Sequence, residues 1–136
     1  MAGYSGTPLI QKLGIKAGYS IALLHAPNGF RKTLTGIPQG VMIGKRLNGS
    51  QDLIHYFTRS KSELTKELPR LRNKITQSGM IWVSWPKKAS KVETDITEDV
   101  VRALALKLGL VDVKVCAVDE VWSGLKLVIP VSRRKK

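Results

Sequence analysis

Two stretches of sequence decide the fold: DLIHYF at residues 52–57 and MIWVSW at residues 80–85. Each is a short run of aromatic and branched apolar side chains, which is typical of a strand buried within a sheet. Between them, leucines recur at helical spacing over residues 64–71, and Ser60 with Glu63 has the spacing of a helix-capping box. A strand, a helix and a strand in this order predict two parallel strands joined by a crossover helix.

The helix between these strands carries two sequence features that limit its course. We expect it to run as far as Ser78–Gly79, with Ile75 on its buried face. Pro69 lies inside it and, because proline lacks a backbone N–H and clashes with the preceding turn, should kink the helix or split it.

The alternation of strands and helices continues on both sides of this unit. Upstream, we expect three elements: a short helix over 7–13 closed by Gly14, a buried strand over 19–25 and a weaker strand over 41–47. Downstream, we expect a helix that begins at Asp95 or Thr97 and is closed by Gly109; its buried face comprises Val100, Val101, Leu104 and Leu108. A strand over 111–121, a turn at 122–124 and a returning strand over 125–131 follow it. These elements predict an α/β fold with a three-layer, mostly parallel sheet, helices on both faces and a C-terminal antiparallel hairpin.

Length and composition place further bounds on the protein. Its 136 residues predict one α/β domain over residues 1–131, followed by a basic C-terminal tail over 132–136. No run of 18 apolar residues is present, which argues against a membrane span, and the N-terminus lacks the pattern of a secretory signal. The single cysteine, Cys116, cannot form an internal disulfide, so we expect a cytoplasmic protein.

Charge is distributed unevenly along the chain. The net charge is +13, and the first 51 residues hold six basic residues and no acid, whereas residues 93–120 hold seven acids against three bases. A basic surface attracts anions by long-range electrostatics, so an anionic small molecule and a nucleic acid are the candidate partners, and the sequence identifies neither. The alternative is a solvated cationic face without a specific ligand.

Candidate site residues follow the predicted parallel strands, because ligands of open α/β sheets bind outside the carboxyl ends of the strands. Cationic side chains beside the start of a helix at Ser60 favour a phosphate or carboxylate ligand. The expected anion-binding crevice comprises His25 and Asn28 after the first strand, Arg59 and Ser60 after the third, and Trp85, Lys87, Lys88 and Ser90 after the fourth. The alternative is that the lysines are solvated loop charges balanced by the acids that follow them.

The sequence offers little for metal binding or catalysis. His25 and His55 are the only histidines, and neither has a cysteine or carboxylate at metal-ligand spacing, so we expect no metal site. His25, at a strand end, has the position of a general base but no identifiable partner, and we assign no catalytic residue. His55, Trp82 and Cys116 are interpreted as packing residues inside the sheet.

Two resemblances refine the fold. Residues 52–131 resemble the second half of class I methyltransferases: a strand that begins with Asp, a helix, a strand that ends in Pro, another helix and an antiparallel hairpin. The whole chain, from GYSGTPLIQKLGIKAGYSIALLHAPNGF (3–30) through WPKKASKVETDITEDVVR (85–102) to KVCAVDEVWSGLKLVI (114–129), resembles a small bacterial domain family of unknown function. Both imply a Rossmann-like, methyltransferase-like fold.

The sequence departs from the methyltransferases where their cofactor binds. That family places a glycine-rich turn after its first strand and an acid at the end of its second. Here the turn has one glycine, Gly29, and contains Pro27, while the second strand ends at Lys45–Arg46 and no acid precedes Asp52. We therefore expect no cofactor and a non-enzymatic binding or interaction module with a basic crevice. A divergent S-adenosylmethionine-dependent methyltransferase and a nucleic-acid-binding protein are the alternatives.

Overall fold

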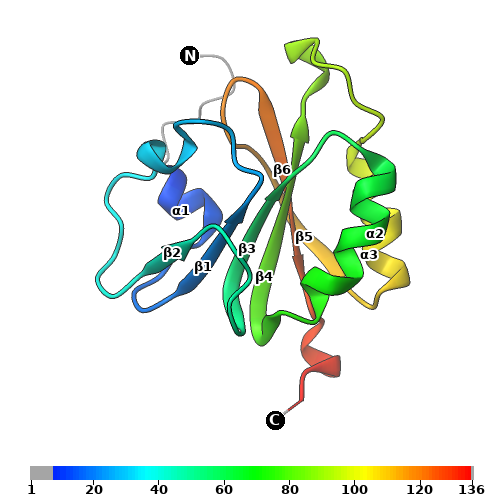
Figure 1. Cartoon of the computed structure of the whole chain (residues 1–136). Helices are drawn as coiled ribbons and strands as arrows, with labels where there is room; N and C mark the ends of the chain where they lie inside the picture. The colour runs from blue at the N-terminus through cyan, green and yellow to red at the C-terminus, as the bar shows by residue number, and fades with distance from the viewer. Residues whose placement is uncertain (1–7, 136) are drawn as a thin grey trace.

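A computed structural model describes residues 8–135, which form one six-stranded sheet with helices packed on it (Figure 1). The strand order is β2-β1-β3-β4-β6-β5; β1 to β4 are parallel, and β6 and β5 are antiparallel to their neighbours. The strands are β1 (Ser20–Leu24), β2 (Met42–Gly44), β3 (Gln51–Phe57), β4 (Ile75–Pro86), β5 (Val111–Ala117) and β6 (Trp122–Val128), and the α-helices are α1 (Leu9–Leu13), α2 (Lys61–Arg72) and α3 (Glu98–Lys107). The predicted α/β class, mostly parallel sheet and terminal hairpin are confirmed.

The core consists of two apolar layers, one on each face of the sheet. Alternate residues of β3 point to opposite faces: Ile54 belongs to the layer that includes the leucines of α2 and residues Val101 and Ala105 of α3. Phe57 belongs to the layer that includes α1 and the 3₁₀ turn η1 (Phe30–Thr33). The sheet is therefore covered on both faces, with α2 and α3 beside each other over one of them (Figure 1).

Upstream elements are shorter than predicted. β1 and β2 lie inside the ranges expected for them, and Gly14 closes α1 in a left-handed conformation as expected. Thr7, the predicted start of that helix, and Lys136, the end of the predicted basic tail, lie outside the described residues. Within the tail, the backbone N–H of Lys135 donates to the Gln77 side chain at 2.8 Å.

Helix α2 begins as predicted but ends earlier. The Ser60 hydroxyl accepts the backbone N–H of Glu63 at 3.1 Å, which satisfies one of the free donors of the first turn. Pro69 does not split the helix, which continues to Arg72. Because Pro69 has no backbone N–H, the carbonyl of Thr65, one turn earlier, lacks its helical hydrogen bond. Both residues are exposed, so water can hydrogen-bond this carbonyl instead.

The prediction that the helix reaches Ser78–Gly79 is wrong. Ile75 begins β4, and Gly79 lies inside that strand, where the register between β3 and β4 shifts. A Cβ atom on Gly79 would stand 2.9 Å from the Thr76 hydroxyl and 3.0 Å from the Gln51 carbonyl oxygen. This glycine therefore permits a close backbone approach at an irregular strand pairing, and does not mark the end of a helix.

Helix α3 begins at Thr97, whose hydroxyl accepts the N–H of Val100 at 3.2 Å. Asp95, the other predicted cap, instead accepts the N–H of Lys61 at the start of α2. Val101 is fully buried, whereas the other predicted residues of the stripe, Val100, Leu104 and Leu108, are half-buried.

The hairpin turn lies at residues 118–121, earlier than the predicted 122–124. The Asp119 carboxylate accepts the backbone N–H groups of Val121 and Trp122, each at 2.8 Å, and this side-chain turn reverses the chain. Gly124 lies within β6, where a Cβ would stand 3.1 Å from Trp82, Ser84 and Val118. Gly124, from which the sequence predicted a turn, is therefore a strand residue, and the close packing around it leaves no room for a side chain.

We predict that Gly124→Ala destabilises the protein by about 1–3 kcal/mol, because the added methyl group overpacks a filled layer. Urea unfolding measures the change. Gly44→Ala, at a strand position where the nearest atom lies 3.9 Å away, is the matched control and should cost less. Equal losses in both variants would contradict this packing role.

His55 and Trp82 are packing residues, as predicted. The Trp82 indole N–H donates to the Leu13 carbonyl at 2.9 Å and so joins β4 to α1. His55 Nε2 lies 2.6 Å from the Ser84 hydroxyl, its ring stacks on Phe57, and its Nδ1 has no partner among the described residues. Complete burial lowers the pKa of His55 from 6.5 to about 3.

This buried imidazole predicts acid sensitivity. Below pH 6.5 unfolded His55 binds a proton that folded His55 excludes until about pH 3, so stability falls as pH decreases through that window. The loss is up to about 1.4 kcal/mol per pH unit. Urea unfolding at pH 6.5 and pH 4.5 measures it, and His55→Gln, which keeps a polar group for Ser84 but does not titrate, should lose less. The same loss in both proteins would contradict the assignment.

Candidate functional site

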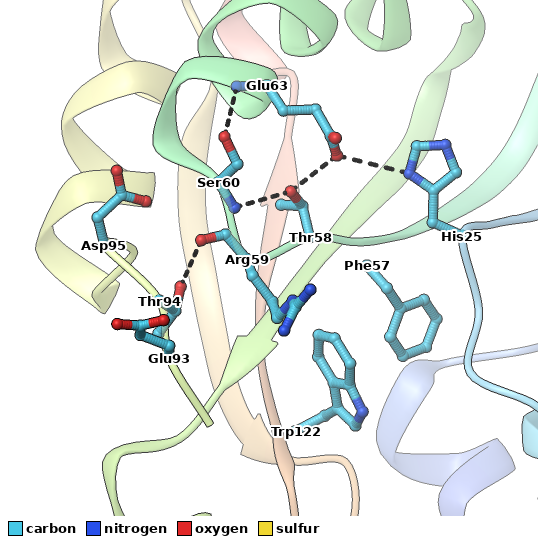
Figure 2. A pocket seen from close by; sticks show the side chains of 10 residues that line it. All are labelled: His25, Phe57, Thr58, Arg59, Ser60, Glu63, Glu93, Thr94, Asp95 and Trp122. Carbon is cyan, nitrogen blue, oxygen red and sulfur yellow. Dashed lines mark hydrogen bonds and ion pairs between the residues drawn. The ribbon is translucent and has the colours of Figure 1, made fainter. Parts of the chain in front are cut away.

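An open cleft of about 890 Å³ lies at the carboxyl ends of β1 and β3 (Figure 2). Four segments build it: the end of β1, the junction of β3 with α2, the segment that precedes α3 and the start of β6. Its lining residues are His25, Phe57, Thr58, Arg59, Ser60, Glu63, Glu93, Thr94, Asp95 and Trp122. The cleft therefore occupies the edge of the sheet at which the sequence predicted a ligand site.

A histidine and a glutamate lie next to each other in the lining of this cleft (Figure 2). His25 Nδ1 lies 3.5 Å from Glu63 Oε1, and the His25 side chain is 59% exposed. His25 has a φ of +58°, a left-handed conformation that is uncommon for a residue with a side chain. Its ring is tilted against that of Tyr56, with centroids 5.2 Å apart. The imidazole is thus held at the cleft and remains accessible to solvent.

The Glu63 carboxylate is fixed by two hydroxyl groups of β3 and the residue after it. Tyr56 Oη and Thr58 Oγ1 each donate to Glu63 Oε1 at 2.8 Å, and Figure 2 shows this carboxylate between Thr58 and His25. Burial works to raise the pKa of Glu63, but the hydrogen bonds from Tyr56 and Thr58, together with His25, outweigh it and leave the pKa below its ordinary value. Glu63 is therefore ionised at neutral pH and oriented toward the imidazole.

Burial, followed by the effect of Glu63, raises the pKa of Tyr56 above its ordinary value, so its phenol remains a hydrogen-bond donor.

The sequence predicted a different role for Glu63, as the second half of a capping box whose side chain bonds the N–H of Ser60. In the structure the N–H of Ser60 donates to Thr58 Oγ1 at 3.2 Å, and the Glu63 side chain is free to face the cleft.

The segment before α3 forms the opposite wall. Thr94 Oγ1 donates to the Arg59 carbonyl at 2.7 Å, and Asp95 Oδ1 accepts the N–H of Lys61 at 2.7 Å. These two bonds fasten the segment to the start of α2. Glu93 and Asp95 add carboxylates to that of Glu63, so the lining holds three carboxylates and one guanidinium.

Phe57 and Trp122 supply the apolar part of the lining. Their rings meet edge to face, with centroids 5.2 Å apart (Figure 2). Trp122 lies at the start of β6 and is half-buried, so part of its ring faces the cleft. A flat apolar surface beside carboxylates is suited to a ligand that combines an aromatic ring with hydroxyl or amino groups.

The eight residues predicted for the site do not all meet. His25, Arg59 and Ser60 line the cleft, and Asn28 lines a smaller pocket next to it. Trp85 is buried in the core under α2 and α3. Lys87, Lys88 and Ser90 lie in the turn after β4 and line neither space. The N–H of Lys87 donates to the Val121 carbonyl at 2.8 Å and joins this turn to the hairpin. Anion binding by the eight residues together stays a prediction.

The smaller pocket, of about 300 Å³, lies on the other side of His25, between the ends of β1 and β2. Its lining residues are Leu23, His25, Ala26, Pro27, Asn28, Gly29, Arg31 and Lys45. It lies at the turn after β1, which has the single glycine Gly29, and at the end of β2, where Lys45 stands and no acid is present.

Two further findings apply to residues 8–135. No group of three or more histidine, cysteine or acidic side chains in this range is arranged to hold a metal ion. No helix in this range is long and apolar enough to cross a membrane.

Comparison with known proteins yields structural neighbours only. No family model matches the chain, and no curated protein matches it. The ribosomal protein L11 methylase of Lactobacillus delbrueckii subsp. bulgaricus superposes with a TM-score of 0.56 at 14% identity, over 94% of this chain and 76% of the methylase. DhpI in its SAH complex gives a TM-score of 0.64 at 9% identity (91% and 83% covered), and a SAM-dependent methyltransferase of Aquifex aeolicus gives 0.58 at 12% identity (90% and 88%).

These similarities confirm the class I methyltransferase-like fold that residues 52–131 predicted, and extend it over nine-tenths of the chain. At such low identity they establish the fold alone. The resemblance to a small bacterial domain family stays a prediction, since no family model matches.

We predict that Tyr56→Phe raises the pKa of Glu63, because it removes one of the two hydroxyl donors that stabilise the carboxylate. Carbon-detected NMR titration of the Glu63 carboxyl group measures this change. Tyr19→Phe, which alters a half-buried tyrosine outside the cleft lining, is the matched control and should leave the titration unchanged. A Glu63 titration that does not move in Tyr56→Phe would show that the phenol does not stabilise the ionised carboxylate.

Proposed function

We propose that this chain is a divergent S-adenosylmethionine-dependent methyltransferase whose reaction centre is the cleft at the carboxyl ends of β1 and β3. The fold similarity to methyltransferases supports this alternative better than the non-enzymatic module that the sequence favoured. The observation that carries the proposal is the exposed His25 imidazole paired with an ionised Glu63 in an open cleft. A packing role would not need an accessible imidazole there.

In this proposal His25 is the general base. Its Nδ1 faces Glu63, which leaves Nε2 to take a proton from a hydroxyl or amino group of the acceptor. Glu63 orients the ring and stabilises the imidazolium that forms, while Tyr56 and Thr58 hold Glu63 in place. Removal of the proton makes the acceptor oxygen or nitrogen more nucleophilic.

S-adenosylmethionine would supply an electrophilic methyl group, and the residues present fit it at one place and not at another. The turn after β1 does not fit, because Pro27 and a single glycine replace a glycine-rich turn and Lys45 stands where an acid would bind the ribose. The cleft fits better: Glu93 and Asp95 can accept hydrogen bonds from hydroxyl and ammonium groups, and Trp122 offers an aromatic face. Carboxylates also favour a ligand with a positive charge.

A non-enzymatic binding protein is the second candidate function. The observation that favours it is the smaller pocket, which is lined by Arg31 and Lys45 and by no carboxylate that could bind a ribose. A protein of this kind would not use the His25–Glu63 pair for proton transfer.

We predict that S-adenosylmethionine and its demethylated product raise the melting temperature by several degrees at saturating concentration, because a ligand that binds only the folded state stabilises it. Glu93→Gln and Trp122→Ala should reduce the shift. Lys66→Gln, on the exposed side of α2, is the control and should retain it.

His25→Gln separates catalysis from binding. It should keep the melting-temperature shift but lower the release of demethylated product about 10²–10⁴-fold, measured with a small-molecule extract as the source of acceptor. Lack of any shift with either adenosyl compound would overturn the methyltransferase proposal. A shift with no effect of His25→Gln on product release would overturn the assignment of the base.

A further inference from the structure

We propose that the pocket between the ends of β1 and β2 binds the phosphate group of a small phosphorylated molecule. The pocket is separate from the cleft, and this inference does not require that the chain transfer a methyl group. It rests on the charge, the free donors and the size of the pocket.

Two cations approach the pocket from different elements. Arg31 lies in the η1 turn, and Lys45 directly follows β2, so the fold brings together two residues 14 positions apart. Neither forms an ion pair with any residue between 8 and 135. His25 and Asn28 add two further nitrogen-bearing side chains to the wall.

No carboxylate lines the pocket to neutralise these cations. The first acid in the sequence is Asp52, and its carboxylate accepts the N–H of Ser20 at 2.8 Å. Ser20 begins β1, so Asp52 is engaged at the opposite edge of the sheet. An anionic ligand therefore meets uncompensated positive charge in this pocket.

The turn after β1 adds backbone donors. The N–H groups of Asn28 and Gly29 make no hydrogen bond to any described residue. Gly29 has a φ of +82°, and no atom lies within 4 Å of where its Cβ would stand, so the tip of the turn is open. Free backbone N–H groups of a turn, together with cationic side chains, are the donors that bind phosphate in proteins.

Size favours a small molecule over a polymer. A volume of about 300 Å³ lies at the lower end of the range for small-molecule sites and suits a ligand of mononucleotide size or less. Binding of single-stranded nucleic acid needs an extended basic groove with aromatic stacking surfaces, and the lining of this pocket includes no aromatic residue other than His25.

The position of His25 connects the pocket to the cleft. His25 lines both, so a ligand whose phosphate lies between Arg31 and Lys45 would extend past the imidazole. If the proposed function holds, this ligand is the acceptor, and the phosphate would hold it with a hydroxyl or amino group near Nε2. That assignment rests on the proposed function, whereas phosphate binding by the pocket does not.

Isothermal titration at low salt tests the pocket with three probes: inorganic phosphate, AMP and adenosine. We expect phosphate and AMP to bind, and adenosine to bind at least tenfold more weakly than AMP. Lys45→Gln and Arg31→Gln should each weaken AMP binding about tenfold, because each removes a charged donor to the phosphate. Arg46→Gln and Lys32→Gln, adjacent residues outside the lining, are the matched controls and should change it less than twofold.

Three outcomes overturn the inference. The first is no binding of phosphate or AMP. The second is equal weakening by all four substitutions, which would indicate a general effect of net charge. The third is binding of a single-stranded RNA with a steep salt dependence and no binding of AMP, which would favour a nucleic-acid partner. The adenosyl compounds are titrated into the unsubstituted protein as well. Binding of AMP without binding of either adenosyl compound would mean that the proposed function fails while the pocket stands, and binding of the adenosyl compounds without binding of phosphate or AMP would mean the reverse.

Discussion

The site depends on one carboxylate oxygen. Glu63 Oε1 accepts hydrogen bonds from Tyr56 and Thr58 and faces His25, so it links the end of β3, the start of α2 and the end of β1. Because its partners come from the ends of β3 and β1, the position of His25 relative to Glu63 depends on the parallel pairing of β1 with β3. The relative positions of His25 and Glu63 therefore depend mainly on the register between β1 and β3 and on the residue at which α2 begins. The conformation of the loop after β1 has a smaller part.

The sequence predicted the elements well where one local signal dominated. The buried strand β3, residues 80–85 of β4, the cap at Ser60 and the closing glycine of α1 each follow from a pattern within a few residues. Predictions failed where a residue acts through a distant contact. Gly79 and Gly124 look like turn residues, yet each is required by atoms on a neighbouring strand.

The same limit applies to the candidate site. His25, Arg59 and Ser60 were predictable because parallel strands end at one edge. Glu63 was singled out only as a cap, since nothing in its sequence neighbours reveals that Tyr56 and Thr58 would turn its carboxylate toward His25. The sequence suggests Glu93 and Asp95 only as counter-charges to solvated lysines and, for Asp95, as a helix cap, whereas the fold brings both carboxylates to the opposite wall. Long-range pairing of loops leaves no periodic signal in one sequence.

The attachment of Thr94 and Asp95 to the start of α2 has an evolutionary consequence. The chain between Pro86 and Glu93 is a surface connection whose far end is fastened by two hydrogen bonds, so its path need not determine where the wall of the cleft stands. Insertions and deletions in that connection can accumulate in descendants while the wall keeps its place.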